Sequence, residues 1–214
     1  MPSLGRLTDR QLALARAFFR HQPTGYFLTG GAVLAGWELA HRGTDDLDLF
    51  TIEPDAMVPG EQALRRAAAE LGGTVTPVTT SPDFRRFVVH FSDEALKVDL
   101  VRDYTVQQFE KVERDGVVTD TAAEIFVNKL CTLVERSEIR DLVDVMLLER
   151  RGLRVEDSLS RAQQKDAGVT PATMAWLLDS LPIPANPPGG VSHAEVVDYR
   201  AALRDRLLRV ARQG

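Results

Sequence analysis

The chain has 214 residues, of which 44% are hydrophobic and 27% charged, and its net charge is −5. This composition suits a globular protein with one core or two small ones, and no apolar run reaches the roughly 20 residues of a membrane span. The single cysteine, Cys131, excludes an internal disulfide and a cysteine-rich zinc site. Residues 1–6 lack the apolar core of a signal peptide, so we expect a cytoplasmic protein without a membrane partner.

The first half of the chain alternates between helical and extended patterns. Thr8 and Gln11 are spaced as a capping box, which starts a helix. Apolar periodicity and turn residues then predict, in chain order, a helix to about His21, a strand over 25–29, a helix over 32–41, a strand over 47–52, a helix over 60–71 ending at Gly72-Gly73, and strands over 74–80, 84–91 and 96–101.

Beyond residue 101 the pattern turns helical. Helices are predicted over 105–112, 121–136, 139–150, 155–166, 171–181 and 193–212. The proline-rich segment 181–190 cannot continue a helix and is predicted to be a semi-rigid linker. The sequence therefore predicts an α+β fold. A mixed sheet with flanking helices (residues 1–112) is followed by an all-helical domain (113–214) that completes a cleft.

A glycine pair and two aspartates stand out in the first half. Gly30-Gly31 opens a predicted helix, where backbone N–H groups can bind phosphate, although such a pair is also an ordinary tight turn. Asp46 and Asp48 are spaced i, i+2 on a predicted strand, so they share one face and can bind a hard divalent cation. The alternative interpretation of Asp46 and Asp48 is that they belong to a polar turn. Phosphate and cation sites together indicate chemistry on a nucleoside triphosphate.

Asp99 is the third candidate carboxylate. It lies on a predicted strand whose apolar residues, Leu96, Val98 and Leu100, alternate with Lys97 and Asp99. If that strand neighbours the one carrying Asp48, three carboxylates meet, which is the arrangement that two-metal phosphoryl transfer needs. Taken alone, Asp99 is better explained as a hydrated carboxylate at the end of a strand, whereas the presence of Asp46 and Asp48 favours a metal ligand.

The helix predicted over 121–136 carries cations on its apolar side. Arg136 and Arg140 fall within about 20° of Lys129 on a helical wheel, unless the helix breaks near Ser137. Glu124 lies on the opposite, acidic side. Buried cations need a partner, and a bound triphosphate or the internal carboxylates Asp141 and Asp144 would each serve. Spacing does not choose between them.

Other signals are weaker. The four histidines are scattered, and the P-loop and nucleophile-elbow motifs are missing. Thr29 offers a hydroxyl for capping or for a phosphate, and Arg42 is placed to brace the aspartate loop or to contact phosphate. The last predicted helix carries a run of arginines that is either a solvated face or a landing site for RNA: Arg200, Arg204, Arg206, Arg209 and Arg212.

These motifs resemble the nucleotidyltransferase superfamily of DNA polymerase β, and more closely its AbiEii/AbiGii branch of bacterial toxin–antitoxin toxins. The resemblance covers residues 25–150. It rests on Gly30-Gly31, Leu34, the run Arg42-Gly43-Thr44-Asp45-Asp46-Leu47-Asp48-Leu49-Phe50, Asp99, Lys129, and the cluster Arg136, Arg140, Asp141 and Asp144. A second glycine stands where many superfamily members have a serine.

The resemblance implies transfer of a nucleoside monophosphate from an NTP to an acceptor, which is tRNA in some toxins, and implies an antitoxin partner. It implies that Lys129 binds phosphate and that Asp141 is catalytic or orienting. The expected metal ligands for Mg²⁺ or Mn²⁺ are Asp46, Asp48 and Asp99, which with Asp141 form the catalytic set. The expected NTP-binding residues are Thr29, Gly30, Gly31, Arg42, Thr44, Lys129, Arg136 and Arg140.

Two other functions remain open. The same chemistry can act on a small cationic acceptor such as an aminoglycoside, which the acidic net charge favours. Alternatively, the chain binds NTP without turnover, and then it would show nucleotide-dependent stabilisation without release of pyrophosphate. Three carboxylates speak against the last possibility, because a sensor has little need for two metals.

Overall fold

The computed structural model describes residues 7–21 and 25–213; residues 1–6, to which the signal-peptide expectation refers, lie outside them. Contacts divide the chain into two compact units. One holds the described residues up to Thr105 together with Phe109–Thr121, and the other holds Val106–Gln108 and the residues from Ala122 onward. The division into domains at residues 112/113 stays a prediction. None of the described helices is both long enough and apolar enough to cross a bilayer.

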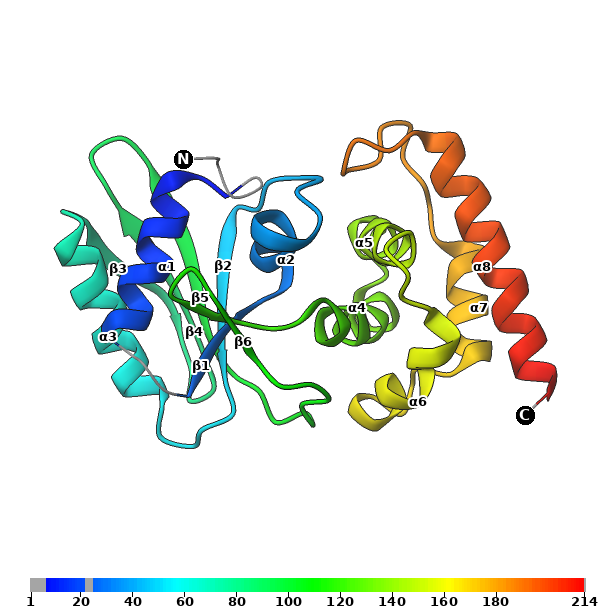
Figure 1. The fold of residues 1–214 in the computed structure, drawn as a ribbon, viewed down its shortest axis with the longest axis horizontal. Helices are drawn as coiled ribbons and strands as arrows, with labels where there is room; N and C mark the ends of the chain where they lie inside the picture. The colour runs from blue at the N-terminus through cyan, green and yellow to red at the C-terminus, as the bar shows by residue number, and fades with distance from the viewer. Residues whose placement is uncertain (1–6, 22–24, 214) are drawn as a thin grey trace. The chain divides into compact units, whose positions relative to one another are not determined.

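The first unit is built on a mixed seven-stranded sheet (Figure 1). Its strands are β1 (Tyr26–Thr29), β2 (Asp46–Thr51), β3 (Thr74–Thr80), β4 (Phe84–His90), β5 (Ala95–Arg102), β6 (Val112–Arg114) and β7 (Val117–Thr119), in the order β3-β4-β5-β2-β1-β7-β6. β2 runs parallel to β5, and β1 runs parallel to β7. The other neighbouring pairs are antiparallel.

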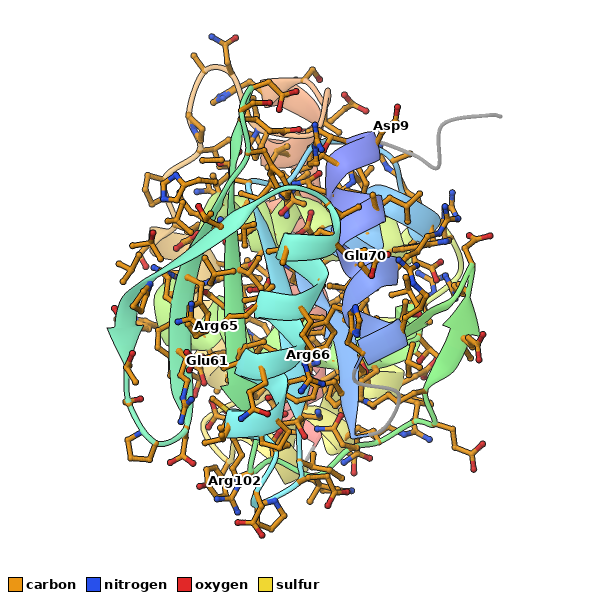
Figure 2. The ribbon with its side chains drawn as sticks, turned by 90° about the vertical axis from the view of Figure 1, so that its left-hand side faces the viewer. Asp9, Glu61, Arg65, Arg66, Glu70 and Arg102 are labelled. Carbon is orange, nitrogen blue, oxygen red and sulfur yellow. The ribbon has the colours of Figure 1, made fainter. Side chains whose placement is uncertain are left out.

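Two helices, α1 (Asp9–His21) and α3 (Met57–Glu70), cover one face of this sheet (Figure 2). The capping box is confirmed, because Gln11 N–H donates to Thr8 Oγ1 and Thr8 N–H donates to Gln11 Oε1. Tyr26 points from β1 toward both helices: its ring packs edge-on against Phe18, and its hydroxyl donates to Ala56 O. The buried hydrophobic residues of β2, Leu47 and Leu49, lie on the same face as Tyr26.

The helix expected over 32–41 begins and ends earlier. It consists of α2 (Gly30–Val33) and the π-helical turn η1 (Leu34–Glu38), in which Leu39 N–H donates to Leu34 O. Gly30 has φ +64°, a conformation that favours glycine, so the start of α2 depends on this residue. Glu38 of η1 forms an ion pair with Arg114 of β6, which links η1 to the β6–β7 hairpin.

The prediction of a helix over 105–112 is wrong. Thr105 N–H donates to Asp103 Oδ1, so a side chain satisfies the backbone in place of a helical carbonyl. β6 then starts at Val112 and returns as β7 through a two-residue turn, Asp115-Gly116, with φ of +53° and +78°. Asp-Gly between extended residues is the typical sequence of such a turn, and that signal was available in the sequence.

The second unit is helical, and its predicted helices are confirmed to within one or two residues (Figure 1). They are α4 (Ala122–Arg136), α5 (Ile139–Glu149), α6 (Val155–Lys165), α7 (Pro171–Ser180) and α8 (His193–Gln213). α4 packs against α5 and α6, and α7 packs against α8. Residues 181–190 form no helix, as expected. The α+β fold class is therefore confirmed.

Candidate active site

The predicted neighbourhood of the Asp48 and Asp99 strands is confirmed by the register of the sheet. β2 and β5 pair in parallel with Asp48 opposite Asp99 and Asp46 opposite Lys97. Side chains opposite each other in a ladder share a face, and the i, i+2 spacing places Asp46 on that face too. Leu47 occupies the other face, under the helices. Three carboxylates thus occur on the sheet face opposite α1 and α3.

The glycine pair lies against these aspartates. A Cβ at Gly30 would come within 2.9 Å of Asp48 Oδ2, and a Cβ at Gly31 would lie 3.1 Å from Thr44 Oγ1 and 3.6 Å from an Arg42 Nη. Thr44 in turn donates to Asp46 Oδ1 over 3.0 Å. The turn, the aspartate strand and the loop before it therefore meet at one place, as a site for a triphosphate beside carboxylates would require.

Buried Asp120 supports the turn from the adjacent strand. Thr29, just before Gly30, donates its hydroxyl to Asp120 Oδ2, while Asp120 N–H donates to Leu28 O over 2.9 Å. Lys111 pairs with the same carboxylate. The capping interpretation of Thr29 is wrong, because its side chain makes no cap hydrogen bond to α2. Sequence reasoning missed Asp120, because nothing in the sequence set it beside Thr29.

Arg86 is the second residue that sequence reasoning missed. It lies opposite Asp99 in the antiparallel β4–β5 pair and forms a bidentate ion pair, with Nε to Oδ1 at 2.8 Å and Nη2 to Oδ2 at 2.7 Å. The hairpin between β4 and β5 sets this register. Phe91 N–H donates to Glu94 O, which closes a two-residue turn, and counting outward from that turn sets Arg86 opposite Asp99.

The residues suit a divalent cation in kind but are not gathered around one. Carboxylate oxygens are the ligands that Mg²⁺ and Mn²⁺ take in proteins. Within the described ranges, however, no three acidic, histidine or cysteine side chains come close enough together to hold a metal ion. Asp99 has both oxygens on Arg86, so the expected three-carboxylate ligand set is not assembled in this arrangement.

In the helical unit, Lys129 meets internal carboxylates. Its Nζ lies 2.7 Å from Asp141 Oδ1 and 2.7 Å from Asp144 Oδ2, and all three side chains are buried. Arg136 Nε adds a contact of 2.8 Å to Asp141. Of the two alternatives left open by the spacing, the structure contains the internal carboxylates.

Two cations set the protonation of Asp141. Burial by itself would raise the pKa of Asp141, but hydrogen bonds from Arg136 and the charge of Lys129 outweigh it. The pKa of Asp141 therefore lies below its ordinary value, and the carboxylate is ionised at neutral pH.

The expected basic stripe does not extend to Arg140. Ser137, with φ +53°, separates α4 from α5, so the helical phase between Lys129 and Arg140 is lost. Arg140 pairs instead with Glu138 at the surface. The prediction that Glu124 lies on the solvent-facing side is also wrong, because this carboxylate is fully buried and pairs with Lys165.

Solved structures share this fold. JHP933 from Helicobacter pylori has 18% identity and a TM-score of 0.56, over 97% of this chain and 97% of that one. MenT4, a nucleotidyltransferase toxin from Mycobacterium tuberculosis, has 14% identity and a TM-score of 0.58, over 92% of this chain and 80% of that one. At such identities the likeness concerns the fold alone. A comparison with curated proteins found no match.

The glycine turn packed on the Asp-x-Asp strand lies in a fold that MenT4 shares. The particular family follows from the sequence, since the model of the nucleotidyl transferase AbiEii toxin of type IV toxin–antitoxin systems matches residues 12–209. The chain belongs to the AbiEii family. It is thus a nucleotidyltransferase enzyme of the toxin type, and the resemblance seen in the sequence is confirmed.

Proposed function

We propose that this AbiEii-family enzyme transfers a nucleoside monophosphate from an NTP to an RNA acceptor, with tRNA as the first candidate. In this reaction an acceptor hydroxyl oxygen forms a bond to the α-phosphorus, the bond between the α- and β-phosphates breaks, and pyrophosphate leaves. The position of Asp48 is the observation that supports it best. Asp48 stands opposite Asp99 in the sheet, and a Cβ at Gly30 would lie 2.9 Å from its Oδ2.

The triphosphate would bind at the turn between β1 and α2. α2 is only four residues long, so the backbone N–H groups of Gly30 and Gly31, more than a helix dipole, would bind the phosphates. Arg42, whose guanidinium approaches Gly31, would add charge-assisted hydrogen bonds. Thr44 would orient Asp46, to which it already donates. The hydroxyl of Thr29 is bonded to Asp120 and would act by holding the turn.

Asp46 and Asp48 would hold the divalent cation, Mg²⁺ or Mn²⁺, with Asp99 completing the ligand set. When bound, the cation would neutralise the triphosphate and lower the pKa of the attacking hydroxyl. Asp99 would accept the proton of that hydroxyl if the acceptor comes within hydrogen-bond reach.

The helical unit would contribute differently from the sequence expectation. The two cations Lys129 and Arg136 are balanced by the two carboxylates Asp141 and Asp144. We therefore propose that Asp141 orients Lys129 and Arg136, and that phosphate contacts come from the exposed parts of Arg136 and Arg140.

The proposal is tested by incubating the protein with each α-³²P-labelled NTP, total tRNA, and Mg²⁺ or Mn²⁺. We expect label on RNA with at least one nucleotide, and its loss in Asp48→Asn, which keeps the size of the side chain but removes its charge. No transfer with any nucleotide, or equal transfer by the variant, would contradict the proposal. Thermal stabilisation by NTP without release of pyrophosphate would identify a binding module instead.

The salt dependence of acceptor binding distinguishes the two acceptor classes. Binding of tRNA should weaken steeply between 50 and 200 mM salt, by about tenfold or more, because phosphate contacts release counterions. Label on an aminoglycoside, with none on tRNA, would replace RNA by a small cationic acceptor. As a member of a toxin family, the protein is proposed to act in the cytoplasm, where NTP and tRNA occur, and to be paired with an antitoxin.

A further inference from the structure

The ion pair between Arg86 and Asp99 lies where the proposed reaction needs a free carboxylate. Both Asp99 oxygens accept from one guanidinium, at 2.8 and 2.7 Å, and the Asp99 side chain is buried. A carboxylate has about four lone-pair sites, and a bidentate guanidinium takes the two that face it. A dication at Asp99 would therefore meet both an occupied ligand and a positive charge.

Burial of Arg86 does not explain its ion pair with Asp99. Its side chain is 43% exposed, whereas the neighbouring Arg85 is 15% exposed and pairs with Glu61 of α3 on the helix-covered face. Arg86 has a second contact on its own strand, with its guanidinium 5.5 Å from the centre of the Phe84 ring. The guanidinium can therefore leave Asp99 and stay against Phe84.

All three acids of the site act on this cation. The cross-strand register sets Arg86, Asp99 and Asp48 in one row on one face of the sheet. Hydrogen bonding to Asp99 raises the pKa of Arg86, and the charges of Asp46 and Asp48 raise it further. Three carboxylates on one face repel each other, so a cation at this place stabilises the folded chain whether it is a guanidinium or a metal ion.

We propose that Arg86 is an internal counter-ion of the catalytic carboxylates that competes with the divalent cation for Asp99. The inference rests on the proposed function, because it takes Asp46, Asp48 and Asp99 as the cation ligands. Arg86 is thus a positioning residue: it holds Asp99 in place without metal and has to release it before the ligand set is complete. Its removal should tighten metal binding and destabilise the metal-free protein.

The test is Mn²⁺ binding to the full chain without nucleotide, measured by calorimetry or by the loss of the free-ion EPR signal. In Arg86→Gln we expect the Kd for Mn²⁺ to fall about tenfold. In EDTA the same variant should melt at a lower temperature than wild type, and Mn²⁺ should raise its Tm by more. Arg85→Gln is the matched control, and its Kd for Mn²⁺ should equal that of wild type.

A double-variant cycle assigns the gain to Asp99. In the Asp99→Asn background, Arg86→Gln should no longer tighten Mn²⁺ binding, because the ligand under competition is missing. An unchanged or weaker Kd in Arg86→Gln overturns the proposal, and so does an equal gain in Arg85→Gln. If Arg86→Gln does not fold, Arg86→Lys is used: it keeps the charge but loses the bidentate geometry, and should tighten binding by a smaller factor.

The outcomes separate this inference from the proposed function. Tighter Mn²⁺ binding in Arg86→Gln, with no nucleotidyl transfer by wild type, would support the competition and refute the reaction. Transfer by wild type, with no gain in Mn²⁺ affinity in the variant, would support the reaction and refute the competition. No Mn²⁺ binding by wild type or variant would refute the inference and the metal dependence together.

Discussion

At the scale of single residues, Gly30 connects backbone conformation to the site. We expect Gly30→Ala to lower nucleotidyl transfer about a hundredfold, because the new methyl group would displace Asp48, and small displacements of catalytic groups cost that much. The same change should destabilise the fold by about 1–2 kcal/mol, since φ is +64°. Activity assays and urea denaturation measure the two effects separately.

Gly116→Ala is the control for that prediction. Gly116 also has a positive φ, +78°, but a Cβ there would meet nothing within 4 Å. We therefore expect a similar loss of stability with transfer unchanged. If both variants lose activity equally, backbone strain and not the contact with Asp48 explains the effect.

The lowered pKa of Asp141 predicts a specific pH dependence of stability. Its pKa is lowered in the folded protein, so its contribution to the free energy of unfolding is fully present above the unfolded value of about 3.9. That contribution is lost as the pH falls through the lower, folded pKa. Asp141→Asn should be less stable than wild type by about 3 kcal/mol at pH 7, because Lys129 loses a buried partner.

The measurement is guanidinium denaturation of wild type and Asp141→Asn between pH 3 and pH 7. The difference in the free energy of unfolding should stay constant down to about pH 4 and shrink below it. Glu135→Gln, which removes an exposed carboxylate of α4, is the control, and its free energy of unfolding should stay within about 0.5 kcal/mol of wild type. A difference that grows on acidification would show that Asp141 is not held ionised by Lys129 and Arg136.

At the scale of elements, the packing of α4 on α6 protects Cys131. Burial raises the pKa of this thiol to about 11, and its Sγ lies 3.7 Å from Ala162 O. At pH 8 only about one molecule in a thousand would carry the reactive thiolate. We expect the folded protein to react with a thiol reagent at least a hundredfold more slowly than the denatured chain; equal rates would mean that α4 and α6 do not pack.

The last helix is bound to its unit by its arginines. Arg206 on α8 contacts Glu149 and Glu156 at 2.6 Å each. Arg206→Gln should therefore cost about 2 kcal/mol of unfolding free energy, since hydrogen bonds to charged groups are lost. Arg209→Gln changes the same charge at an exposed position and should stay within about 0.5 kcal/mol of wild type in chemical denaturation. Equal losses would assign the effect to net charge.

At the scale of the whole molecule, each unit carries its own reporter of folding. With Trp176→Phe, the remaining Trp37 in η1 reports on the sheet unit, while Cys131 labelling reports on the helical unit. We expect the two urea transitions to have different midpoints, because each unit has its own core. NTP with Mn²⁺ should raise the urea midpoint reported by Trp37 more than the midpoint reported by Cys131, since the proposed ligands belong to the sheet unit. Coincident transitions would indicate one cooperative domain.

Much of the fold could be predicted because its signals are local. The capping box at Thr8, the alternation around Asp48 and the helical periods after residue 121 each depend on neighbours a few positions away. Two predictions that failed also turned on local features. The 105–112 helix gave way to side-chain hydrogen bonds and to a hairpin, and the phase of Arg140 was lost at Ser137.

The sequence by itself determined the fold class, the family, the glycine turn and the identity of the candidate carboxylates, because residue type and short spacing carry that information. Only the tertiary structure decided what each carboxylate meets. Strand pairing set Arg86 on Asp99, and helix packing set Lys129 between Asp141 and Asp144. The energy of a buried charge depends on its nearest partners in space, and these come from residues far apart in the chain.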